Sequence, residues 1–242
     1  MQHGECNLSV LAVEKIRCLS LGVPVLDCLL PGFKPGDFIV VKGNAATFMS
    51  FLLSVRCQLR ERKGGLNSSV VFIDGGNSFD PYLVAEVARS YSLDPQLALD
   101  RIYVSRAFTV YQLSSLILEK LDPFLRRTKS RLLLVSNINS LFLDGDASEN
   151  EAKDLFVKVC SRLSKIAVGK KLVVIVTYSP ERVSRKNFSF KTVLLSKSNI
   201  SITLVRKGKI LRFILEDHPH VNQFMIEFQM ASRASLTAFR KT

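Results

Sequence analysis

Four short apolar runs are spaced along most of the chain. They cover residues 38–42, 70–74, 131–136 and 172–177, and each is aliphatic or β-branched almost throughout, without polar alternation. A strand that is buried on both faces has this pattern, and such strands are typical of parallel sheets covered by helices. We therefore predict four central strands of a parallel sheet.

Longer segments with helical periodicity lie between these runs, at residues 48–62, 81–90, 110–125 and 149–168. In the last of them the apolar residues Leu155, Val159 and Leu163 recur at helical spacing, and charged residues occupy the other face. Strand and helix thus alternate along the chain. The alternation predicts an α/β fold with a mainly parallel twisted sheet flanked by helices.

The pattern changes after residue 177. Residues 199–205, 209–215 and 223–229 alternate between apolar and polar positions, as strands with one solvated face do. A basic turn, residues 206–209, joins the first two, and Gly208 there permits a positive φ. Since no repeat or linker interrupts the chain, we predict an antiparallel C-terminal extension of the same sheet and a single domain over residues 1–242.

Length and composition exclude several classes of protein. A chain of 242 residues that is 47% hydrophobic and 23% charged is typical of a packed globular domain, not of a fibre or a disordered tail. Its five cysteines form no C-x-x-C pair, so neither a disulfide framework nor a zinc site is expected. No apolar run approaches the roughly 20 residues that span a bilayer. We expect a cytoplasmic protein, nuclear if eukaryotic, with no membrane partner.

Charge is the unusual quantity. Lys+Arg 34 against Asp+Glu 21 gives a formal net charge of +13. Such a balance favours a polyanionic partner, and nucleic acid, an anionic membrane or an acidic protein would each satisfy it. A basic surface that is merely solvated is the alternative.

The first apolar run ends at a degenerate phosphate-binding motif. A strand, a loop that begins with glycine and a helix are the setting of the P-loop, G-x-x-x-x-G-K-[ST]. Gly43 supplies the first glycine and Ser50 the final hydroxyl, but Phe48 replaces the second glycine and Met49 replaces the lysine. A phenylalanine obstructs the backbone approach to phosphate, and a thioether cannot supply the positive charge.

The segments around this motif resemble the core of the RecA/RadA recombinase superfamily. They are L-S-L-G-V-P-V-L-D at 19–27, F-I-D-G-G-N-S-F-D-P at 72–81, I-Y-V-S-R-A at 102–107, and L-V-R-K-G-K with E-D-H-P-H near the C-terminus. The resemblance runs in collinear order from about residue 17 to 230. In size the chain resembles RadB-like and other short paralogues, and we expect no separate N-terminal helical DNA-binding domain.

The resemblance implies a RecA-type ATPase core that acts in homologous recombination and DNA repair, but the catalytic positions depart from the family pattern. The catalytic glutamate falls on Gly76 and the Walker B aspartate on Ser136. Together with Met49, these changes remove the groups that neutralise phosphate charge and activate water. We predict a pseudo-ATPase with no catalytic residue, no metal site and no ATP–Mg cofactor. Weak nucleotide binding through Gly43, the neighbouring amides and Ser50 is the alternative, since a helix N-terminus attracts anions.

The family's DNA-contacting loops follow the third and fourth central strands. The first, residues 144–151, is acidic here and is not assigned to DNA. The second, over residues 179–197, is a basic segment with interleaved aromatic residues. The turn after residue 205 extends this basic surface. Cations neutralise phosphates and aromatics stack on unpaired bases. The predicted DNA-binding residues are Arg182, Arg185, Lys186, Phe188, Phe190, Lys191, Lys197, Arg206 and Lys207.

A plain structural interpretation of this segment is a charged surface loop whose phenylalanines cap the core. Two further basic clusters, residues 60–63 and 126–131, are explained as a helix end and a solvated linker. The function hypotheses are an accessory factor that binds single-stranded DNA, a RadA-type recombinase or another paralogue; a protein-only adaptor of a paralogue complex; and a divergent ATP-binding ATPase. A signalling module of the RecA superfamily is a more distant fourth.

Overall fold

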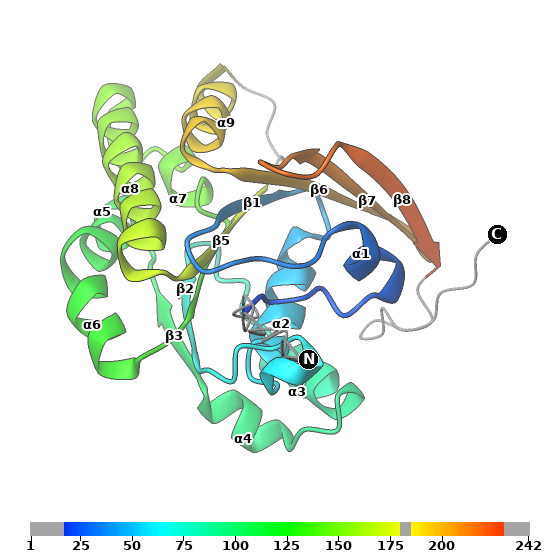
Figure 1. Cartoon of the computed structure of the whole chain (residues 1–242). Coiled ribbons are helices and arrows are strands. Elements are labelled where there is room, and N and C mark those ends of the chain that lie inside the picture. Colours follow the sequence, from blue (N-terminus) through cyan, green and yellow to red (C-terminus); the bar gives the residue numbers. More distant parts are fainter. Residues whose placement is uncertain (1–16, 180–184, 230–242) are drawn as a thin grey trace, which may run out of the picture.

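The computed structural model describes residues 17–179 and 185–229, and these form one sheet with helices on both faces (Figure 1). The strand order within the described residues is β3-β2-β4-β5-β1-β6-β7-β8. The parallel strands are β1 (Phe38–Lys42), β2 (Val70–Asp74), β3 (Ile102–Arg106), β4 (Leu132–Ser136) and β5 (Val173–Tyr178), and β6 (Ile200–Lys207) is parallel to β1. The prediction of an α/β fold with a RecA-like, mainly parallel sheet is confirmed.

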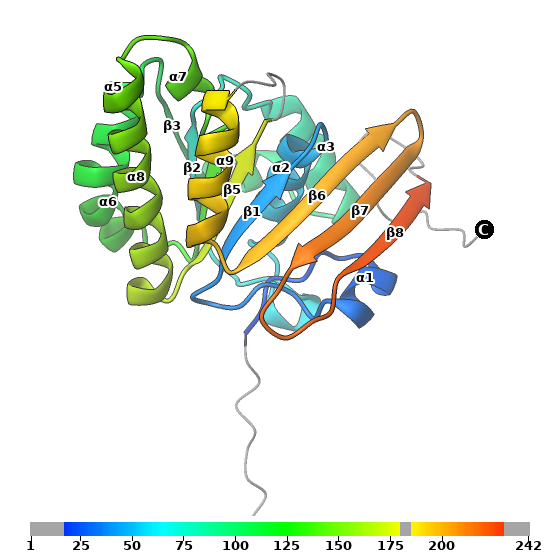
Figure 2. The same cartoon turned by 90° about the horizontal axis from the view of Figure 1, so that it is seen from above.

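The helices form two groups, one packed on each face of the sheet (Figures 1 and 2). The first group comprises α1 (Pro24–Leu29), α2 (Ala46–Arg56), a 3-10 turn (Glu61–Lys63), α3 (Pro81–Ser90) and α4 (Pro95–Asp100). The second comprises α5 (Val110–Ser115), a π-helical turn (Leu116–Lys120), α6 (Leu121–Thr128), α7 (Ser140–Leu143), α8 (Glu149–Lys170) and α9 (Arg185–Lys197). No helix among the described residues is long and apolar enough to cross a membrane.

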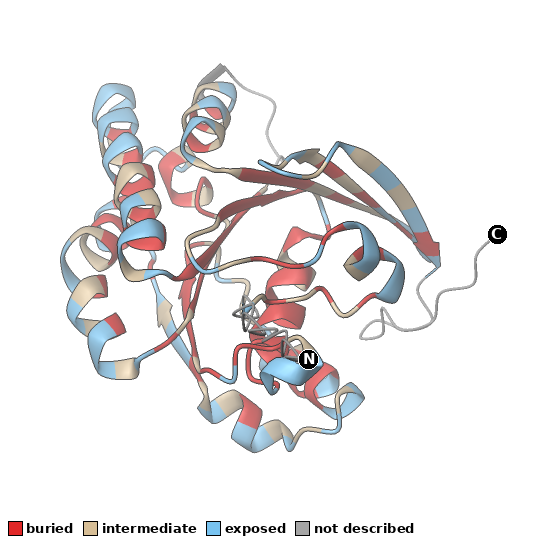
Figure 3. Ribbon diagram, in the orientation of Figure 1, coloured by how far each residue is buried: buried red, intermediate tan, exposed pale blue. Residues whose placement is uncertain are grey.

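The central strands contribute side chains to both cores. In β1, Ile39 and Val41 pack with α2 and α3, whereas Phe38 and Val40 pack with α8 and α9. Successive strand residues point to opposite faces, so a strand with helices on both sides must be apolar throughout. Figure 3 shows the resulting continuous buried band along the middle of the sheet. The four uninterrupted apolar runs in the sequence are these strands.

β3 lacks this signal because it lies at the edge of the sheet. It pairs with β2, and within it Tyr103 and Val104 are exposed while Ile102 is buried. An edge strand in this position does not need a continuous apolar run. The hydrophobic pattern of the sequence therefore did not predict it.

The antiparallel extension consists of β6, β7 (Ile210–Asp217) and β8 (Phe224–Gln229), and its prediction is confirmed. Along β7 the buried residues Leu211, Phe213 and Leu215 alternate with more exposed ones, because one face packs on the core. Gly208 adopts a φ of +58° in the turn between β6 and β7, as the sequence predicts.

The segment predicted as a basic loop over residues 179–197 is largely the helix α9, so that prediction is wrong. Phe190 and Leu194, one helical turn apart, are both buried. The Phe190 ring lies 4.6 Å from the Phe156 ring and 5.9 Å from the Phe142 ring, centroid to centroid. Arg182 lies outside the described residues. The helix forms because its apolar face completes the core above β1 and α8.

The two phenylalanines of α9 are expected to differ sharply in their effect on stability. Phe190→Ala should lower the free energy of unfolding by about 3–5 kcal/mol, since Phe190 is only 1% exposed and its loss leaves a cavity. Phe188→Ala should change it by less than about 0.5 kcal/mol, since Phe188 is 72% exposed. Urea denaturation of both variants measures this, and equal losses would contradict the placement of α9.

Candidate functional site

The nucleotide position of a RecA-like fold lies at the carboxyl ends of the parallel strands, where ligands bind in open α/β sheets. Here β1 ends at Lys42 and α2 begins at Ala46, so only three residues connect them. The helix predicted from residue 48 thus begins two residues earlier, and five of the eight motif positions, residues 46–50, are helical. The short connection leaves little chain with which to surround a phosphate group.

Gly43 is required by close packing against β6. Its φ is +100°, and a Cβ atom built there would lie 2.0 Å from the carbonyl oxygen of Leu204. The next residues bind the same strand. The Ala45 amide donates to the Leu204 carbonyl (3.3 Å), and the Asn44 side chain donates to the carbonyl of Arg206 (3.0 Å) and accepts from its amide (2.7 Å). The amides expected to meet an anion are thus partly engaged by β6.

The remaining residues of the motif belong to the first turns of α2. Met49 is 2% exposed and lies in the core, and Phe48 is partly buried against the same core, as the sequence predicts. Ser50 is 1% exposed, and its hydroxyl donates to the carbonyl of Thr47 at 2.6 Å. The hydroxyl retained from the motif is therefore used inside the helix.

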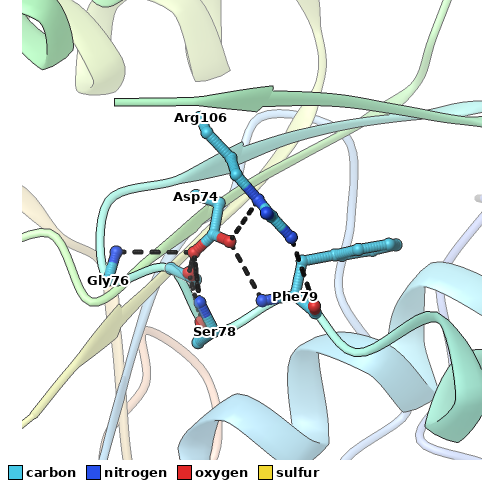
Figure 4. A network of polar contacts seen from close by, with 6 residues as sticks. Asp74, Gly76, Ser78, Phe79 and Arg106 are labelled. Atoms are coloured by element: carbon cyan, nitrogen blue, oxygen red, sulfur yellow. Dashed lines mark hydrogen bonds and ion pairs between the residues drawn. The ribbon is translucent and has the colours of Figure 1, made fainter. Parts of the chain in front are cut away.

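Asp74, at the end of β2, is the centre of a dense polar network (Figure 4). Its carboxylate is fully buried and accepts hydrogen bonds from the Ser78 amide (2.9 Å), the Ser78 hydroxyl (3.1 Å), the Phe79 amide (2.9 Å) and, more weakly, the Gly76 amide (3.4 Å). The Arg106 guanidinium approaches it at 3.5 Å from the neighbouring strand β3. The carboxylate thereby organises the segment that follows β2.

Ser136, at the position of the Walker B aspartate, belongs to this network. Its hydroxyl donates to an oxygen of Asp74 at 2.9 Å and lies 2.9 Å from the Ser78 hydroxyl. Burial raises the pKa of Asp74, but the hydrogen bonds from Ser78, Phe79 and Ser136 outweigh that effect, and the pKa is lowered overall. Asp74 is therefore a charged group that is already saturated by donors from the protein.

Gly76, at the position of the catalytic glutamate, is packed against Asn137. A Cβ atom built on Gly76 would lie 2.5 Å from Nδ2 of Asn137 and 2.7 Å from its Cβ. Asn137 has a φ of 48°, and its amide donates to the Thr177 hydroxyl at 2.8 Å. Any side chain at position 76, a carboxylate included, would have to displace Asn137.

Lys42 is a cation near the site, but its charge is already paired. This residue ends β1, is buried, and forms an ion pair with Glu216 of β7. Glu216 also accepts from the hydroxyls of Ser201 (3.0 Å) and Thr203 (2.6 Å). Burial raises the pKa of Glu216, but the bond from Lys42 and the two hydroxyls lower it by more, so the pKa of Glu216 is lowered overall.

The predicted DNA-binding residues do not form one loop surface. Arg185 and Lys186 begin α9 and Lys197 ends it, so a rise of 1.5 Å per residue separates the two ends by about 18 Å. Phe188 is exposed, Lys191 is partly exposed and Lys197 is exposed. Phe190 is buried in the core, so its assignment to base stacking is wrong. The structural alternative, in which a phenylalanine caps the core, holds for this residue.

Arg206 and Lys207 lie at the end of β6, beside the loop that follows β1. The Arg206 backbone binds Asn44, and the Arg206 side chain donates to the carbonyl of Gly208 at 3.1 Å. Lys207 and the following Lys209 are exposed. The hairpin turn therefore presents cations at the same end of the sheet as the nucleotide position.

Sequence reasoning missed three residues of this region: Asn44, Ser78 and Asn137. Ser78 could have been found, because an Asp followed at short range by Gly, Asn and Ser is typical of a turn closed by side-chain hydrogen bonds. Asn44 and Asn137 act through strands that are distant in sequence. Their partners are known only once the strand order is known.

The Asp74 network predicts a specific acid sensitivity. Asp74→Asn should lower the free energy of unfolding near neutral pH by about 2–4 kcal/mol, because the surrounding donors lose a charged acceptor. Since folding lowers the pKa of Asp74, its contribution is present above the ordinary carboxyl range and is lost as pH falls through the folded value. The difference between the wild type and the variant should therefore shrink from about pH 6 to about pH 3.

Urea denaturation across this pH range measures the effect. Asp144→Asn, which changes an exposed carboxylate, is the matched control and should stay within about 0.5 kcal/mol of the wild type. A loss in Asp74→Asn that does not vary with pH would contradict the assignment of an ionised, hydrogen-bonded Asp74.

The sheet architecture and the collinear segments agree with one family. Residues 14–190 match the family model of Rad51, which covers most of the chain. This family comprises RecA-type ATPases with recombinase-related roles. The resemblance to the RecA/RadA superfamily is confirmed, and the chain belongs to the Rad51 family.

Proposed function

We propose that this chain is a catalytically inactive member of the Rad51 family that acts as an accessory factor in homologous recombination and DNA repair. It binds single-stranded DNA, an active recombinase, or both, and contributes a shaped surface instead of ATP turnover. The observation that carries the proposal is the packing of the nucleotide position. The groups that would hold Mg–ATP are replaced by, or engaged in, contacts within the fold.

The donor set around Gly43 does not fit Mg–ATP. Phosphate transfer requires a cation at the β- and γ-phosphates, and Met49 presents a buried thioether there. A magnesium site requires oxygen ligands free to coordinate, but Ser50 bonds within its helix and Asp74 is saturated by protein donors. Gly76 leaves no group to activate water. No step of ATP hydrolysis is therefore assigned to this chain.

Nucleic-acid binding is supported by the cations of the β6–β7 turn and of α9. Lys207 and Lys209 are exposed and are free of ion pairs within the described residues, whereas Arg212 on β7 is paired with Glu227 at 2.7 Å. On α9 the ring of Phe188 is exposed, and Lys191, another predicted DNA-binding residue, is partly exposed. Unpaired cations exchange their counterions for phosphates, and an exposed ring can stack on an unpaired base.

A protein-only adaptor is the second candidate, and the free edge of β3 favours it. Within the described residues β3 pairs only with β2, and Tyr103 and Val104 on it are exposed. A hollow of about 550 Å³ adjoins the end of the strand and is lined in part by Phe108 and Tyr111. An exposed strand edge beside apolar side chains suits the addition of an extended segment from a partner protein.

The first test concerns the nucleotide. ATP–Mg should not raise the melting temperature of the protein, whereas a ligand at 100 times its Kd would stabilise it by about 2.7 kcal/mol. Phosphate release should stay at the buffer level in the wild type and in Ser50→Ala alike. Release that is measurable in the wild type and abolished in Ser50→Ala would favour the divergent ATPase.

The second test concerns DNA. A fluorescent single-stranded oligonucleotide is titrated by anisotropy across a salt series, with and without ATP–Mg. The affinity for the oligonucleotide should fall as salt increases and should not change with ATP–Mg. It should also fall several-fold in Arg185→Ala/Lys186→Ala and in Lys207→Gln/Lys209→Gln. Lys153→Gln/Lys158→Gln, which removes two exposed cations from α8, is the control for net charge. Failure of the wild type to bind DNA, with salt-insensitive binding to an active recombinase, would favour the adaptor.

A further inference from the structure

A second basic site lies at the opposite end of the sheet from the nucleotide position. It is a pocket of about 610 Å³, open to solvent, with Leu66, Leu125 and Leu172 among its apolar lining. Six cations from three segments of the chain also line it, and we call them the amino-end cluster: Arg17, Arg126, Lys129, Arg131, Lys170 and Lys171.

The strand directions place this pocket. Pro35 precedes β1, Arg131 immediately precedes β4, and Leu172 immediately precedes β5, and all three line the pocket. Figure 2 shows that β1, β5 and β6 run in the same direction. The first residues of the parallel strands therefore lie at one end of the sheet, and Gly43, after β1, and Arg206, near the end of β6, lie at the other. The pocket is therefore separate from both the nucleotide position and the β6–β7 turn.

The amino-end cluster carries more positive charge than its surroundings neutralise. Glu61 pairs with Arg17 (3.0 Å) and Arg131 (3.3 Å), and Asp122 pairs with Arg126 (2.8 Å) and Lys170 (3.1 Å). Neither carboxylate lines the pocket. Lys129 and Lys171 are exposed and form no ion pair within the described residues. Four of the six cations thus share two carboxylates, and the other two have no carboxylate partner among the described residues.

Helix capping accounts for only part of this arrangement. Lys129 directly follows α6 and Lys171 directly follows α8 as C-cap residues, where a cation offsets the helix dipole. Both residues adopt a left-handed conformation with a φ of 52°, which glycine and asparagine favour and lysine does not. Arg17 and Arg131 lie at no helix end. The shared feature of the four is the pocket that they line.

The chemistry of the pocket selects phosphate. Arginine and lysine together offer charged N–H donors from several directions, which matches a phosphate group better than an apolar or cationic ligand. No aromatic side chain lines the pocket in the described part of the chain, so it offers no platform for base stacking. Contacts of this kind recognise the sugar–phosphate backbone without reading sequence.

We propose that the amino-end cluster is a phosphate-binding site that takes the backbone of a nucleic-acid strand. It is a second nucleic-acid contact, distinct from α9 and the β6–β7 turn, and it does not depend on the state of the nucleotide position. A strand held at both ends of the sheet would have to pass around the molecule. A strand held at one end alone would leave the other free for a second segment.

The test removes the two unpaired lysines. Lys129→Asn/Lys171→Asn is chosen because asparagine tolerates the left-handed backbone of both positions, so the fold should be retained. Anisotropy of a labelled thymidine 30-mer is measured from low to physiological salt. The variant should bind about tenfold more weakly at low salt, and the slope of log affinity against log salt should fall by about 1.4, the value for two lost contacts on a single strand.

Three comparisons decide the outcome. Lys153→Gln/Lys158→Gln removes the same net charge elsewhere and should stay within about twofold of the wild type. A loss confined to Lys207→Gln/Lys209→Gln would overturn the amino-end site and leave the proposed DNA contact at the turn intact. A loss confined to Lys129→Asn/Lys171→Asn would support the amino-end site and overturn the proposed DNA contact at the turn. An equal effect of the amino-end and control variants would also overturn the site.

Competitors identify the source of the phosphate. Unlabelled thymidine 30-mer should displace the probe at a lower phosphate concentration than tripolyphosphate, because a strand contacts several cations at once. Stronger displacement by tripolyphosphate would overturn the assignment to a nucleic-acid backbone in favour of a small phosphorylated ligand. Stronger displacement by polyglutamate would assign the pocket to an acidic protein segment instead.

Discussion

The buried carboxylate of Asp74 constrains the carboxyl end of the sheet. An ionised group with no solvent exposure is tolerated only where donors surround it, and here the donors come from the chain itself. To supply them, the segment after β2 must fold back so that the amides of Ser78 and Phe79 point at the carboxylate. Ser136 and Arg106 then connect β4 and β3 to the same charge. One anion therefore fixes the ends of three neighbouring strands.

The chain that follows β1 is likewise held in place by contacts within the fold. Gly43 lies against the Leu204 carbonyl, and Asn44 bonds to the backbone of Arg206, so the connection to α2 is held by the antiparallel extension. Restoring one functional group would not restore a site. A lysine at position 49 would place an ammonium in the core, and a glutamate at position 76 would collide with Asn137. The departures from the family pattern are thus mutually dependent through packing.

The sequence predicted the elements whose signal is local. β1, β2, β4 and β5 are buried on both faces, so each needs apolar side chains at nearly every position, and the sequence of each run shows this directly. β3 was missed because an edge strand has no such requirement. α9 was missed because the apolar pair Phe190 and Leu194 is embedded among basic residues. The helix after β1 was predicted to begin at residue 48, and its earlier start at Ala46 accompanies contacts with β6 that the sequence does not display.

The candidate site was harder to predict, because its geometry depends on partners far apart in sequence. Ser136 reaches Asp74 across 62 residues, and Thr177 binds Asn137 across 40. The amino-end cluster likewise gathers residues from three segments. Sequence proximity suggested a solvated linker at residues 126–131, since the rest of the pocket was not visible. Phe48, Met49 and Ser50, which the motif comparison singled out, are packed in or against the core as part of α2.

The distribution of charge then separates the two ends of the molecule. Near the nucleotide position, Lys42 is paired with Glu216 and Arg106 with Asp74, so these cations are neutralised inside the fold. At the amino end, Lys129 and Lys171 are unpaired within the described residues, and Arg17 shares Glu61 with Arg131. A polyanion responds to uncompensated charge at the surface, not to the total. A polyanionic partner of the kind we propose would therefore meet unpaired cations at the amino-end pocket and the β6–β7 turn, while Lys42, Arg106 and Ser50 are engaged by partners within the fold.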